Sequence, residues 1–412
     1  MWQKIKNIYH LFQSLLANIY YGFPGRKLNV IAVTGTSGKT TTTLMIYEVL
    51  KAAKLKTSVL SSIQAVIGGE EFDTGFHVTT PDPHVLPKYL NQALKNGDTH
   101  FVLEVSSHAM DQNRAAFVPF KIGVLTSFAH EHLDYHKTLK NYARAKFKLL
   151  HAAENVIIPV NVINEELQRE VRFNKLLPKL ITFGLKEGNE TQEKWNLKIK
   201  LPGDFNLLNA LAAASVGSKL HISGSVIKYA LESFLGIPGR YERITNNKGI
   251  TIIIDFAHKV DALEALLKSV QSLTKNGNRI ICMFGCASER DILKRPIMGK
   301  ISGLMADITV LTDEDPRYED PLKIINEISA GCIEAGAEEV SRSGFRAKNY
   351  KNHIFFKIPD RQEAINFIID KLAEKGDIIL LCGKGHEKSM NYKGIEQPWS
   401  EHKAVKKALT KT

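Results

Sequence analysis

Val33-Thr34-Gly35-Thr36-Ser37-Gly38-Lys39-Thr40 is the stretch of sequence that decides the fold. The apolar run before it, residues 28–33, predicts a buried strand, and residues 41–53 repeat apolar positions at helical spacing. A glycine-bearing turn between a strand and a helix directs backbone N–H groups and the helix N-terminus toward phosphate oxygens. We expect Lys39 to reach the outer phosphates and the Thr40 hydroxyl to bind Mg²⁺. Val33 stands where the general phosphate-loop pattern has its first glycine, so the loop is a shorter variant.

Strand-like and helical runs alternate along the rest of the chain. Apolar stretches at 101–105, 122–126 and 156–160 predict strands and 141–150 predicts a helix, whereas 185–200 lacks a pattern and predicts a surface hairpin or loop. A second alternating series follows the hinge Gly236-Ile237-Pro238-Gly239, with strands predicted at 251–256, 279–284, 308–311, 355–358 and 378–382 and helices near 262–273, 296–305, 321–335 and 364–375. Such alternation is typical of an α/β fold with parallel sheets covered by helices.

Length and composition narrow the class of protein. A chain of 412 residues should hold two or three domains, and no run approaches the roughly 18 apolar residues of a membrane span. The net charge of +12 comes without basic runs interleaved with aromatic residues, so we expect a phosphate-rich substrate or a basic proteome rather than nucleic acid. The four cysteines lack the paired spacings of disulfide or zinc sites, which predicts buried thiols in a cytoplasmic protein.

The first 22 residues form an amphipathic segment. Lys4, Lys6 and His10 interrupt any apolar region of a signal peptide, and no small-residue cleavage site follows. We expect the apolar stripe to pack on the next domain. Docking on a membrane surface or a partner is the alternative, because the segment carries lysines and no acid. The stripe comprises Trp2, Ile5, Ile8, Phe12, Leu15, Leu16 and Ile19.

Two further strand ends carry polar chemistry. Glu104 closes a predicted central strand, where a carboxylate can hold Mg²⁺ beside the phosphate loop, although a capping role is the alternative for this residue alone. His130, His132 and His136 follow the next strand, but neither cysteine partners nor an H-E-x-x-H pattern accompanies them, so zinc is not expected.

Eleven motifs in order resemble the Mur ligases, and among these most closely the MurE enzymes. They are TGTSGKTTT (34–42), TTP (79–81), EVSSHAMDQNR (104–114), HEHLDYHKT (130–138), NYARAKFKLL (141–150), FNLLNALAA (205–213), PGRYERI (238–244), DFAH (255–258), KRPIMG (294–299), DEDPR (313–317) and GKGHE (383–387). The resemblance covers residues 28–412. It implies a central ATP-binding domain over 28–238 and a Rossmann-like C-terminal domain over 239–412, preceded by the amphipathic helix of 1–27.

The resemblance also implies a reaction. Such enzymes transfer the γ-phosphoryl of ATP to a substrate carboxylate, and an amine then attacks the acyl phosphate to give an amide. For a MurE-type ligase the carboxylate is that of D-glutamate in UDP-N-acetylmuramoyl-L-Ala-D-Glu, and the amine belongs to a diamino acid used in peptidoglycan synthesis. ATP and Mg²⁺ are the expected cofactors, and a monomer is expected.

Site residues follow by the same resemblance. Lys39, Lys146 and His132 are the expected catalytic residues, and Lys146 matches a lysine that carries a carbamate. The residues expected to bind the metal are Thr40, Glu104, His132 and Lys146. Those expected to bind ATP are Gly35, Thr36, Ser37, Gly38, Lys39, Thr40, Thr41, Asn206, Asn209, Arg240, Asp255 and His258. Those expected to bind the muramoyl-dipeptide are Thr79, Thr80, Ser106, Gln112 and Arg114.

The incoming amino acid is expected to meet residues of the C-terminal domain, namely Arg290, Glu314, Asp315, Arg317, Gly383 and Glu387. A retained Arg317 favours meso-diaminopimelate, because its distal carboxylate needs a cation. Glu314 and Asp315 replace the Asp and Asn of the family's selectivity motif and add negative charge. L-lysine therefore stays open as the alternative.

The departures from the family leave the acceptor open. The family begins with a domain that binds UDP, where this chain offers 27 residues. UDP would then be bound differently or by a partner, or the acceptor carries no UDP; a lipid-linked or folate-like carboxylate is the enzyme alternative. A catalytically silent scaffold is the non-enzyme alternative, but it would not require the phosphate-loop and metal-site residues. Directly after the DFAH motif, Lys259 and Val260 stand where the family usually has Thr-Pro.

Overall fold

The computed structural model describes residues 2–72, 80–129, 133–160, 162, 168, 172–271, 273–274, 278–288, 291–345 and 353–410. The chain divides into two compact units, unit 1 from Met1 to Leu235 and unit 2 from Gly236 to Thr412. Each unit has its own sheet and its own apolar core, and each is described by itself.

The sheet of unit 1 has at its centre β1, the strand that leads into the phosphate loop. Its order is β4-β3-β2-β5-β1-β6-β7-β8-β9, and every described pair is parallel except β2–β3 and β3–β4 at one edge. The central strands are almost entirely buried, as expected of a parallel sheet covered on both faces. The bounds are β1 Asn29–Thr34, β2 Thr57–Leu60, β3 Ala65–Ile67, β4 Glu70–Phe72, β5 His100–Glu104, β6 Phe120–Leu125, β7 Ala153–Pro159, β8 Leu180–Gly184 and β9 Glu190–Thr191.

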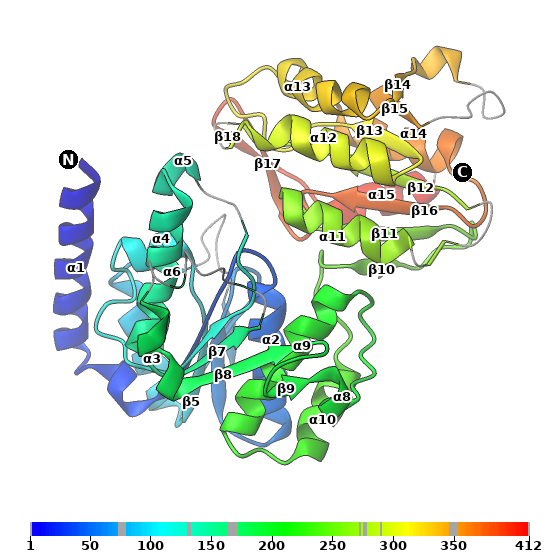
Figure 1. Ribbon diagram of the computed structural model, residues 1–412. Coiled ribbons are helices and arrows are strands. Elements are labelled where there is room, and N and C mark those ends of the chain that lie inside the picture. Colours follow the sequence, from blue (N-terminus) through cyan, green and yellow to red (C-terminus); the bar gives the residue numbers. More distant parts are fainter. Residues whose placement is uncertain are drawn as a thin grey trace. The chain divides into compact units, whose positions relative to one another are not determined.

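Helices cover both faces of this sheet (Figure 1). One face carries α2 (Lys39–Ala52), α9 (Asp204–Lys219) and α10 (Gly224–Ser233), which pack on one another. The other carries α3 (Val85–Lys95), α4 (Ser107–Asp111) and α6 (Leu139–Ala152), whose apolar side chains join the alternate residues of β1 and β5 in one core. The shorter elements are η1 Pro24–Lys27, α5 Leu133–His136, η2 Phe173–Lys175, η3 Leu177–Lys179 and α8 Gln192–Trp195. The stretch 185–200, expected to be a hairpin or loop, holds β9 and the single turn α8.

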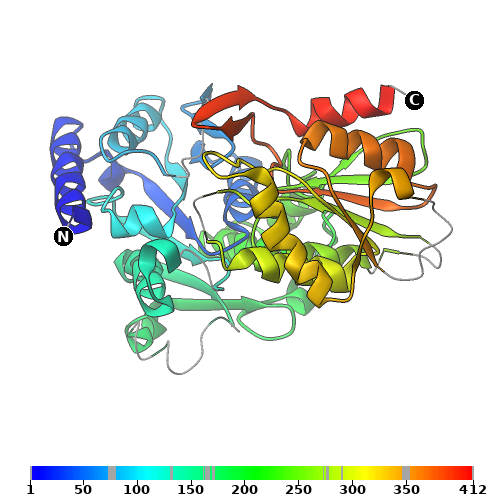
Figure 2. The same ribbon diagram turned by 90° about the horizontal axis from the view of Figure 1, so that it is seen from above.

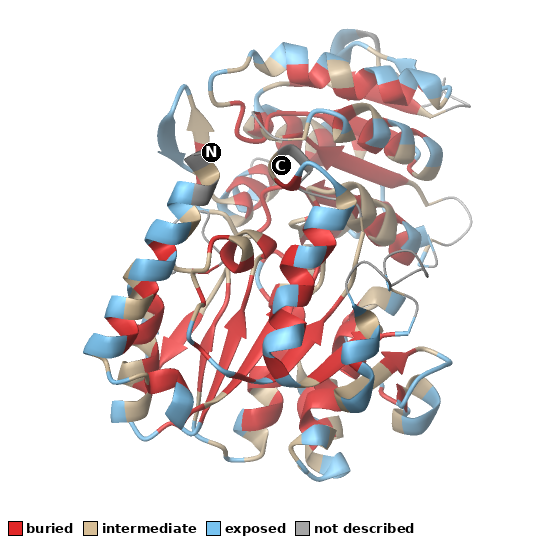
Figure 3. Cartoon of the chain, turned by 60° about the vertical axis from the view of Figure 1, so that its left-hand side comes forward, coloured by how far each residue is buried: buried red, intermediate tan, exposed pale blue. Residues whose placement is uncertain are grey.

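Helix α1 (Trp2–Tyr20) corrects an expectation. The apolar stripe was expected to pack on the following domain, but apart from the half-buried Leu15 its described members are exposed, more than half so at Ile8, Phe12 and Ile19. The helix is attached to unit 1 through its polar side instead, where Ser14 and Asn18 are buried. The prediction of a helix packed on the next domain was right, but the packed face is the polar one, because Gln3 and Ser14 hydrogen-bond to unit 1. Figure 3 shows exposed residues along the outer side of α1.

Unit 2 is a doubly wound domain. Its sheet has the order β10-β11-β16-β12-β13-β15-β14, and the described pairs are parallel except β10–β11. Helices α11 (Val260–Gln271), α12 (Lys294–Met305) and α13 (Pro321–Glu334) line one face, and α14 (Arg361–Phe367) and α15 (Glu401–Thr410) line the other (Figure 2). The strands are β10 Glu242–Ile244, β11 Thr251–Asp255, β12 Ile280–Phe284, β13 Ile308–Leu311, β14 Glu338–Glu339, β15 Ile354–Lys357 and β16 Ile378–Cys382; η4 (Arg342–Gly344), η5 (Ile368–Leu372) and the hairpin of β17 (Ser389–Tyr392) with β18 (Ile395–Pro398) complete the unit.

Two findings bear on the compositional expectations. All four cysteines are buried and form no disulfide. Across the described ranges, no helix is both long enough and apolar enough to cross a membrane.

Candidate functional site

The phosphate loop lies between β1 and α2, as the sequence predicts. Gly38 has a left-handed backbone with φ of 79°, and a Cβ there would strike the Oδ1 atom of Asn209. A Cβ at Gly35 would strike the Oγ1 atom of Thr126, so both positions require glycine. The residues that follow β6 hold the loop in place: Thr126 Oγ1 donates to the Ser37 carbonyl at 2.6 Å. The loop is therefore a preformed cradle at the carboxyl ends of parallel strands.

A hydroxyl and a carboxylate meet beside this loop. Thr40 Oγ1 donates to Glu104 Oε1 at 3.1 Å, and the Ser62 backbone N–H donates to Glu104 Oε2 at 2.8 Å. Glu104 is only 1% exposed. Lys39 Nζ donates to the carbonyls of Thr36 at 2.9 Å and Gly35 at 3.2 Å, and so lies against the loop.

These oxygen donors fit Mg²⁺, which is commonly held by one or two protein oxygens together with phosphate and water. Among the described residues, no group of three or more His, Cys, Asp or Glu side chains could hold a metal ion. The donor set of Thr40 and Glu104 suits a metal that is shared with a phosphate.

Lys146 reaches the phosphate loop from a distant part of the sequence. It projects from α6, is 1% exposed, and its Nζ donates to the Gly35 carbonyl at 2.6 Å. The Nζ also lies 4.5 Å from the centroid of the Tyr142 ring, whose hydroxyl is 2.9 Å from Thr36 Oγ1. Its helical position alone would suggest a solvated lysine, but the structure buries it beside the loop.

The residues assigned to the muramoyl-dipeptide side form a second cluster near Glu104. Thr80 Oγ1 donates to the Glu104 carbonyl and accepts from the Ser106 N–H, both at 3.2 Å. Arg114 donates to the Thr80 carbonyl at 3.2 Å and, through Nη2, to Gln112 Oε1 at 2.6 Å. The structure thus brings together four of the five residues predicted from separate motifs.

Helix α9 supplies the two asparagines. Asn209 Oδ1 accepts from Thr42 Oγ1 at 3.2 Å and lies against Gly38, at the start of α2. Asn206 lies one turn earlier, and its amide donates to the Pro202 carbonyl at 2.8 Å. Thr41 is buried in the first turn of α2. Asn209 is therefore beside the phosphate loop, whereas Asn206 is turned to its own helix start.

In unit 2, Arg240 and His258 lie against the ring of Phe256, the residue that follows Asp255. The Arg240 guanidinium carbon lies 4.4 Å from the Phe256 ring centroid, and the His258 ring centroid lies 4.3 Å from it. Asp255 Oδ2 accepts from the Tyr241 N–H at 2.6 Å. Burial raises the pKa of Asp255, while burial lowers the pKa of His258 well below its usual value. His258 is therefore a neutral ring at pH 7.

The DEDPR and GKGHE motifs meet at the ends of β13 and β16. Lys384, fully buried, has its Nζ 2.9 Å from Asp315 Oδ1 and 2.6 Å from Glu387 Oε2. Glu314 lies against Gly383, where a Cβ would strike Glu314 Oε2. Burial raises the pKa of Glu314 to about 7.

Arg317 occupies an unusual backbone position. Its φ is 49°, and its N–H donates to the Asn391 carbonyl at 3.0 Å while its own carbonyl accepts from the Lys393 N–H at 2.7 Å. The β17–β18 hairpin therefore fixes the backbone of the predicted carboxylate-binding arginine. A non-glycine residue in this region stores strain, which is often found at binding sites.

Three predicted site residues, Thr79, His132 and Arg290, lie outside the described residues. The sequence interpretation also missed residues that hold the site. Arg361 and Glu401, both buried, pair at 2.7 Å, and Arg361 also donates to the carbonyls of Cys382 and Asp313. Forty residues separate the two partners, so no local pattern could pair them. Lys384, which pairs with Asp315 and Glu387, was also missed, although it lies inside the quoted motif GKGHE.

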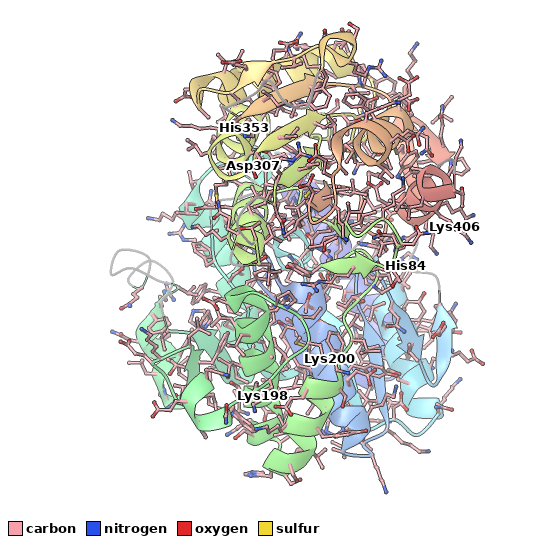
Figure 4. The ribbon with its side chains drawn as sticks, turned by 90° about the vertical axis from the view of Figure 1, so that its right-hand side faces the viewer. His84, Lys198, Lys200, Asp307, His353 and Lys406 are labelled. Carbon is pink, nitrogen blue, oxygen red and sulfur yellow. The ribbon has the colours of Figure 1, made fainter. Side chains whose placement is uncertain are left out.

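Polar side chains at the opposite edge of the unit 2 sheet have a different role. Asp307 and His353, labelled in Figure 4, directly precede β13 and β15. Asp307 Oδ2 accepts from the Ile280 N–H at 2.7 Å, and His353 Nε2 is 3.0 Å from Thr309 Oγ1. Burial lowers the pKa of His353. These groups join strand beginnings and lie away from the ligand-binding edge of a parallel sheet.

Known proteins resemble this chain over most of its length. Residues 33–217 match the family model of the Mur ligase middle domain, and residues 239–385 match that of the Mur ligase glutamate ligase domain. The UDP-N-acetylmuramoyl-L-alanyl-D-glutamate–2,6-diaminopimelate ligase of Alkaliphilus metalliredigens is 35% identical over 94% of this chain and 78% of its own length. The ligase of the same name from Geobacter metallireducens is 34% identical over 94% of this chain and 79% of its own.

Solved structures of related enzymes also resemble this chain. A UDP-N-acetylmuramoyl-L-alanyl-D-glutamate–2,6-diaminopimelate ligase matches with a TM-score of 0.58 and 26% identity over 93% of this chain and 78% of its own. The Mycobacterium tuberculosis folylpolyglutamate synthase, solved with ADP and AMPPCP, matches with a TM-score of 0.68 over 90% and 92% of the two chains; at 15% identity it shows a shared fold. The chain has a phosphate loop and two α/β units, and each unit matches a Mur ligase family model. The chain therefore belongs to the Mur ligase family.

Proposed function

We propose that this chain is an ATP-dependent ligase that joins a diamino acid, meso-diaminopimelate, to the D-glutamyl carboxylate of a muramoyl-L-Ala-D-Glu acceptor. The reaction serves the synthesis of peptidoglycan precursors. Its curated relatives carry names for this activity. The single observation that carries the proposal within the chain is the meeting of Thr40, Glu104 and Lys146 at the phosphate loop.

The chemistry requires that two anions be brought together. The acceptor carboxylate attacks the γ-phosphorus of ATP, and ADP leaves. The amine of the second substrate then attacks the acyl carbon, phosphate leaves with the acyl C–O bond electrons, and the amine loses a proton. Mg²⁺, when bound, neutralises phosphate charge in the first step. Lys39 and the backbone N–H groups of the loop would hold the phosphates, and Thr40 and Glu104 would hold the metal.

Lys146 is proposed to carry a carbamate. Reaction of its amine with CO₂ would replace a cation by an anion, and an anionic oxygen is a preferred ligand of Mg²⁺. Its Nζ lies 2.6 Å from the Gly35 carbonyl, so the modified group would lie beside the phosphate loop. This explains why a lysine rather than an acid occupies a buried position there.

The arrangement in unit 2 supports diaminopimelate. Asp315 adds a carboxylate relative to the family motif, but Lys384 lies 2.9 Å from it and the Asn391 N–H donates to it at 3.0 Å. Its charge is thus offset in part within the protein, by a lysine that also faces Glu387 at 2.6 Å. Arg317 is left as the group proposed to bind the distal carboxylate, and Glu387 as the group proposed to bind the ammonium.

The remaining assignments are proposed on the same basis. Thr80, Ser106, Gln112 and Arg114 bind the acceptor, with Thr79 added from the motif. Asn206, Asn209, Arg240, Asp255 and His258 bind ATP, and Arg290 binds the amino acid. His132 is proposed as a catalytic and metal-site residue.

A phosphate-release assay tests the proposal. Purified chain, ATP and Mg²⁺ are combined with muramoyl-L-Ala-D-Glu, with and without UDP, against meso-diaminopimelate, LL-diaminopimelate and L-lysine. Phosphate release is expected only when acceptor and amino acid are both present. Equal release without the amino acid would overturn the ligase assignment, and the acceptor comparison decides between UDP-linked and UDP-free substrates.

A substitution tests the choice of amino acid. Arg317→Ala should raise the KM for diaminopimelate by about 10²-fold while changing the KM for lysine little, since a charge-assisted pair to a carboxylate is worth roughly 1.5–3 kcal/mol. An equal rise for both amino acids would contradict the role of Arg317 in selection.

A further inference from the structure

Helix α1 presents a continuous apolar face to solvent. Its members recur at intervals of three and four residues and form one side of the helix. Figure 3 shows that α1 carries exposed residues along its length. They are Ile5, Ile8, Tyr9, Phe12, Leu16, Ile19 and Tyr20, each at least half exposed. Scattered exposed apolar residues are ordinary, but a stripe along a whole helix marks an interaction surface.

The opposite face of α1 fixes the helix to unit 1 by polar contacts. Gln3 Nε2 donates to the Tyr135 hydroxyl at 2.8 Å, and Ser14 Oγ donates to the Ala116 carbonyl at 2.9 Å. Asn18 is fully buried, and its amide nitrogen donates to the Ala116 carbonyl at 3.5 Å. Rotation that would bury the apolar stripe would break these contacts. The outward position of the stripe is therefore built into the helix and its partners.

The charges around α1 indicate which kind of partner the apolar stripe binds. Residues 1–47 contain no Asp or Glu, and Lys6, Arg26 and Lys27 are exposed around α1. Helix α3, which packs against α1, adds exposed Lys88 and Lys95 and also lacks an acid. An apolar face bordered by cations is the pattern of a helix that lies in the interface of an anionic bilayer.

A second copy of the chain fits less well. If two α1 helices packed through their stripes, parallel pairing would place Lys6 near Lys6. Antiparallel pairing over the stripe would place Lys6 opposite Ile19. Neither arrangement sets an acid of this segment against the lysine, whereas anionic lipid headgroups would lie beside it and neutralise its charge.

We propose that α1 docks the protein on the surface of an anionic lipid bilayer, with the apolar stripe inserted among the acyl chains and the flanking lysines and arginines at the headgroups. The length of α1, 19 residues, lies parallel to the surface in this arrangement. The docking is independent of the proposed reaction, because no residue of the stripe belongs to the phosphate-loop or acceptor clusters.

Vesicle co-sedimentation of the full chain tests this proposal. Binding is expected to vesicles of phosphatidylcholine with phosphatidylglycerol, to be weak to phosphatidylcholine alone, and to fall with salt. The double variant Ile8→Ser/Phe12→Ser should lower the binding constant at least about tenfold. Tyr229→Ser, an equally exposed site on α10, is the matched control and should bind like the parent. Lys6→Glu/Lys27→Glu should remove the preference for phosphatidylglycerol.

Measurements on the double variant separate a loss of docking from a loss of folding. Ile8→Ser/Phe12→Ser changes exposed side chains, so its thermal midpoint and its phosphate release with a water-soluble acceptor should match the parent. Absence of binding to the anionic vesicles would overturn the proposal. So would a dimer, measured by light scattering, that the double variant converts to a monomer, because the stripe would then serve a second copy.

Discussion

At the scale of single residues, Lys146 is the most informative position. Its buried amine lies 2.6 Å from the Gly35 carbonyl, and the proposed carbamate would supply an anionic oxygen to Mg²⁺. Lys146→Ala should lower kcat by about 10²–10³-fold, the range found when one electrostatic stabiliser of a transition state is removed. Added formate or acetate should restore part of the rate to this variant. Steady-state phosphate release measures both effects.

Lys146→Arg separates the carbamate from a simple positive charge. Arginine keeps the cation but is not carbamylated, so this variant should remain inactive and should not respond to carboxylates. Near-normal turnover in Lys146→Arg would show that only a cation is needed at this position. A ¹³C NMR signal from the parent chain in ¹³C-bicarbonate, absent in both variants, would report the carbamate directly.

Glu314 should make unit 2 less stable as the pH rises. Burial raises its pKa to about 7, whereas the unfolded chain has the usual value near 4.5. Between these values the folded state keeps a proton that the unfolded state has lost, so the free energy of unfolding falls with rising pH. Glu314→Gln cannot ionise and should gain about 2–3 kcal/mol over the parent at pH 8 compared with pH 4.5.

Denaturant unfolding at the two pH values measures this difference. Glu334→Gln, on the exposed side of α13, is the control and should leave the pH dependence unchanged. Asp313, whose pKa burial raises to about 6, shifts stability in the same direction in every variant and therefore cancels in the comparison. A Glu314→Gln gain that is equal at both pH values would contradict the role of ionisation.

At the scale of elements, the sequence predicted those with strong periodicity. The strand over 308–311 and the helices near 321–335 and 262–273 were found with small shifts of their ends. The short edge strands β3 and β4 and the β17–β18 hairpin were not predicted, since three or four residues carry little periodic signal. The sequence found α1 but not its orientation, because the polar partners that hold it come from elsewhere in unit 1.

The same division applies to the site. Residues inside local motifs, such as Thr40 and Gly38, could be placed from strand, turn and helix signals alone. Lys146 needed the family resemblance, because its partner Gly35 is 111 residues away. The pair Arg361–Glu401 joins the ends of β13 and β16 and carries no local pattern at all. Tertiary contacts between distant residues are what the sequence could not supply.

At the scale of the whole molecule, two units with separate sheets and cores should unfold separately. The phosphate loop belongs to unit 1, so Mg-ADP should raise mainly the transition of that unit. A ligand at 100 times its dissociation constant adds about 2.7 kcal/mol, which corresponds to roughly 5–10 °C for a unit of this size. Calorimetry of the full chain measures the shift, and chelation of Mg²⁺ by EDTA should remove most of it.

Two variants identify the transitions in that experiment. Lys39→Ala should abolish the nucleotide shift and leave both transitions in place without ligand, because Lys39 lies against carbonyls of the phosphate loop rather than in the apolar core. Glu314→Gln should move only the transition of unit 2 at pH 8, since its carboxyl is buried against Gly383 within that unit. A single transition that both variants move together would show that the two units unfold as one cooperative body, and a nucleotide shift that survives Lys39→Ala would place the nucleotide away from the loop.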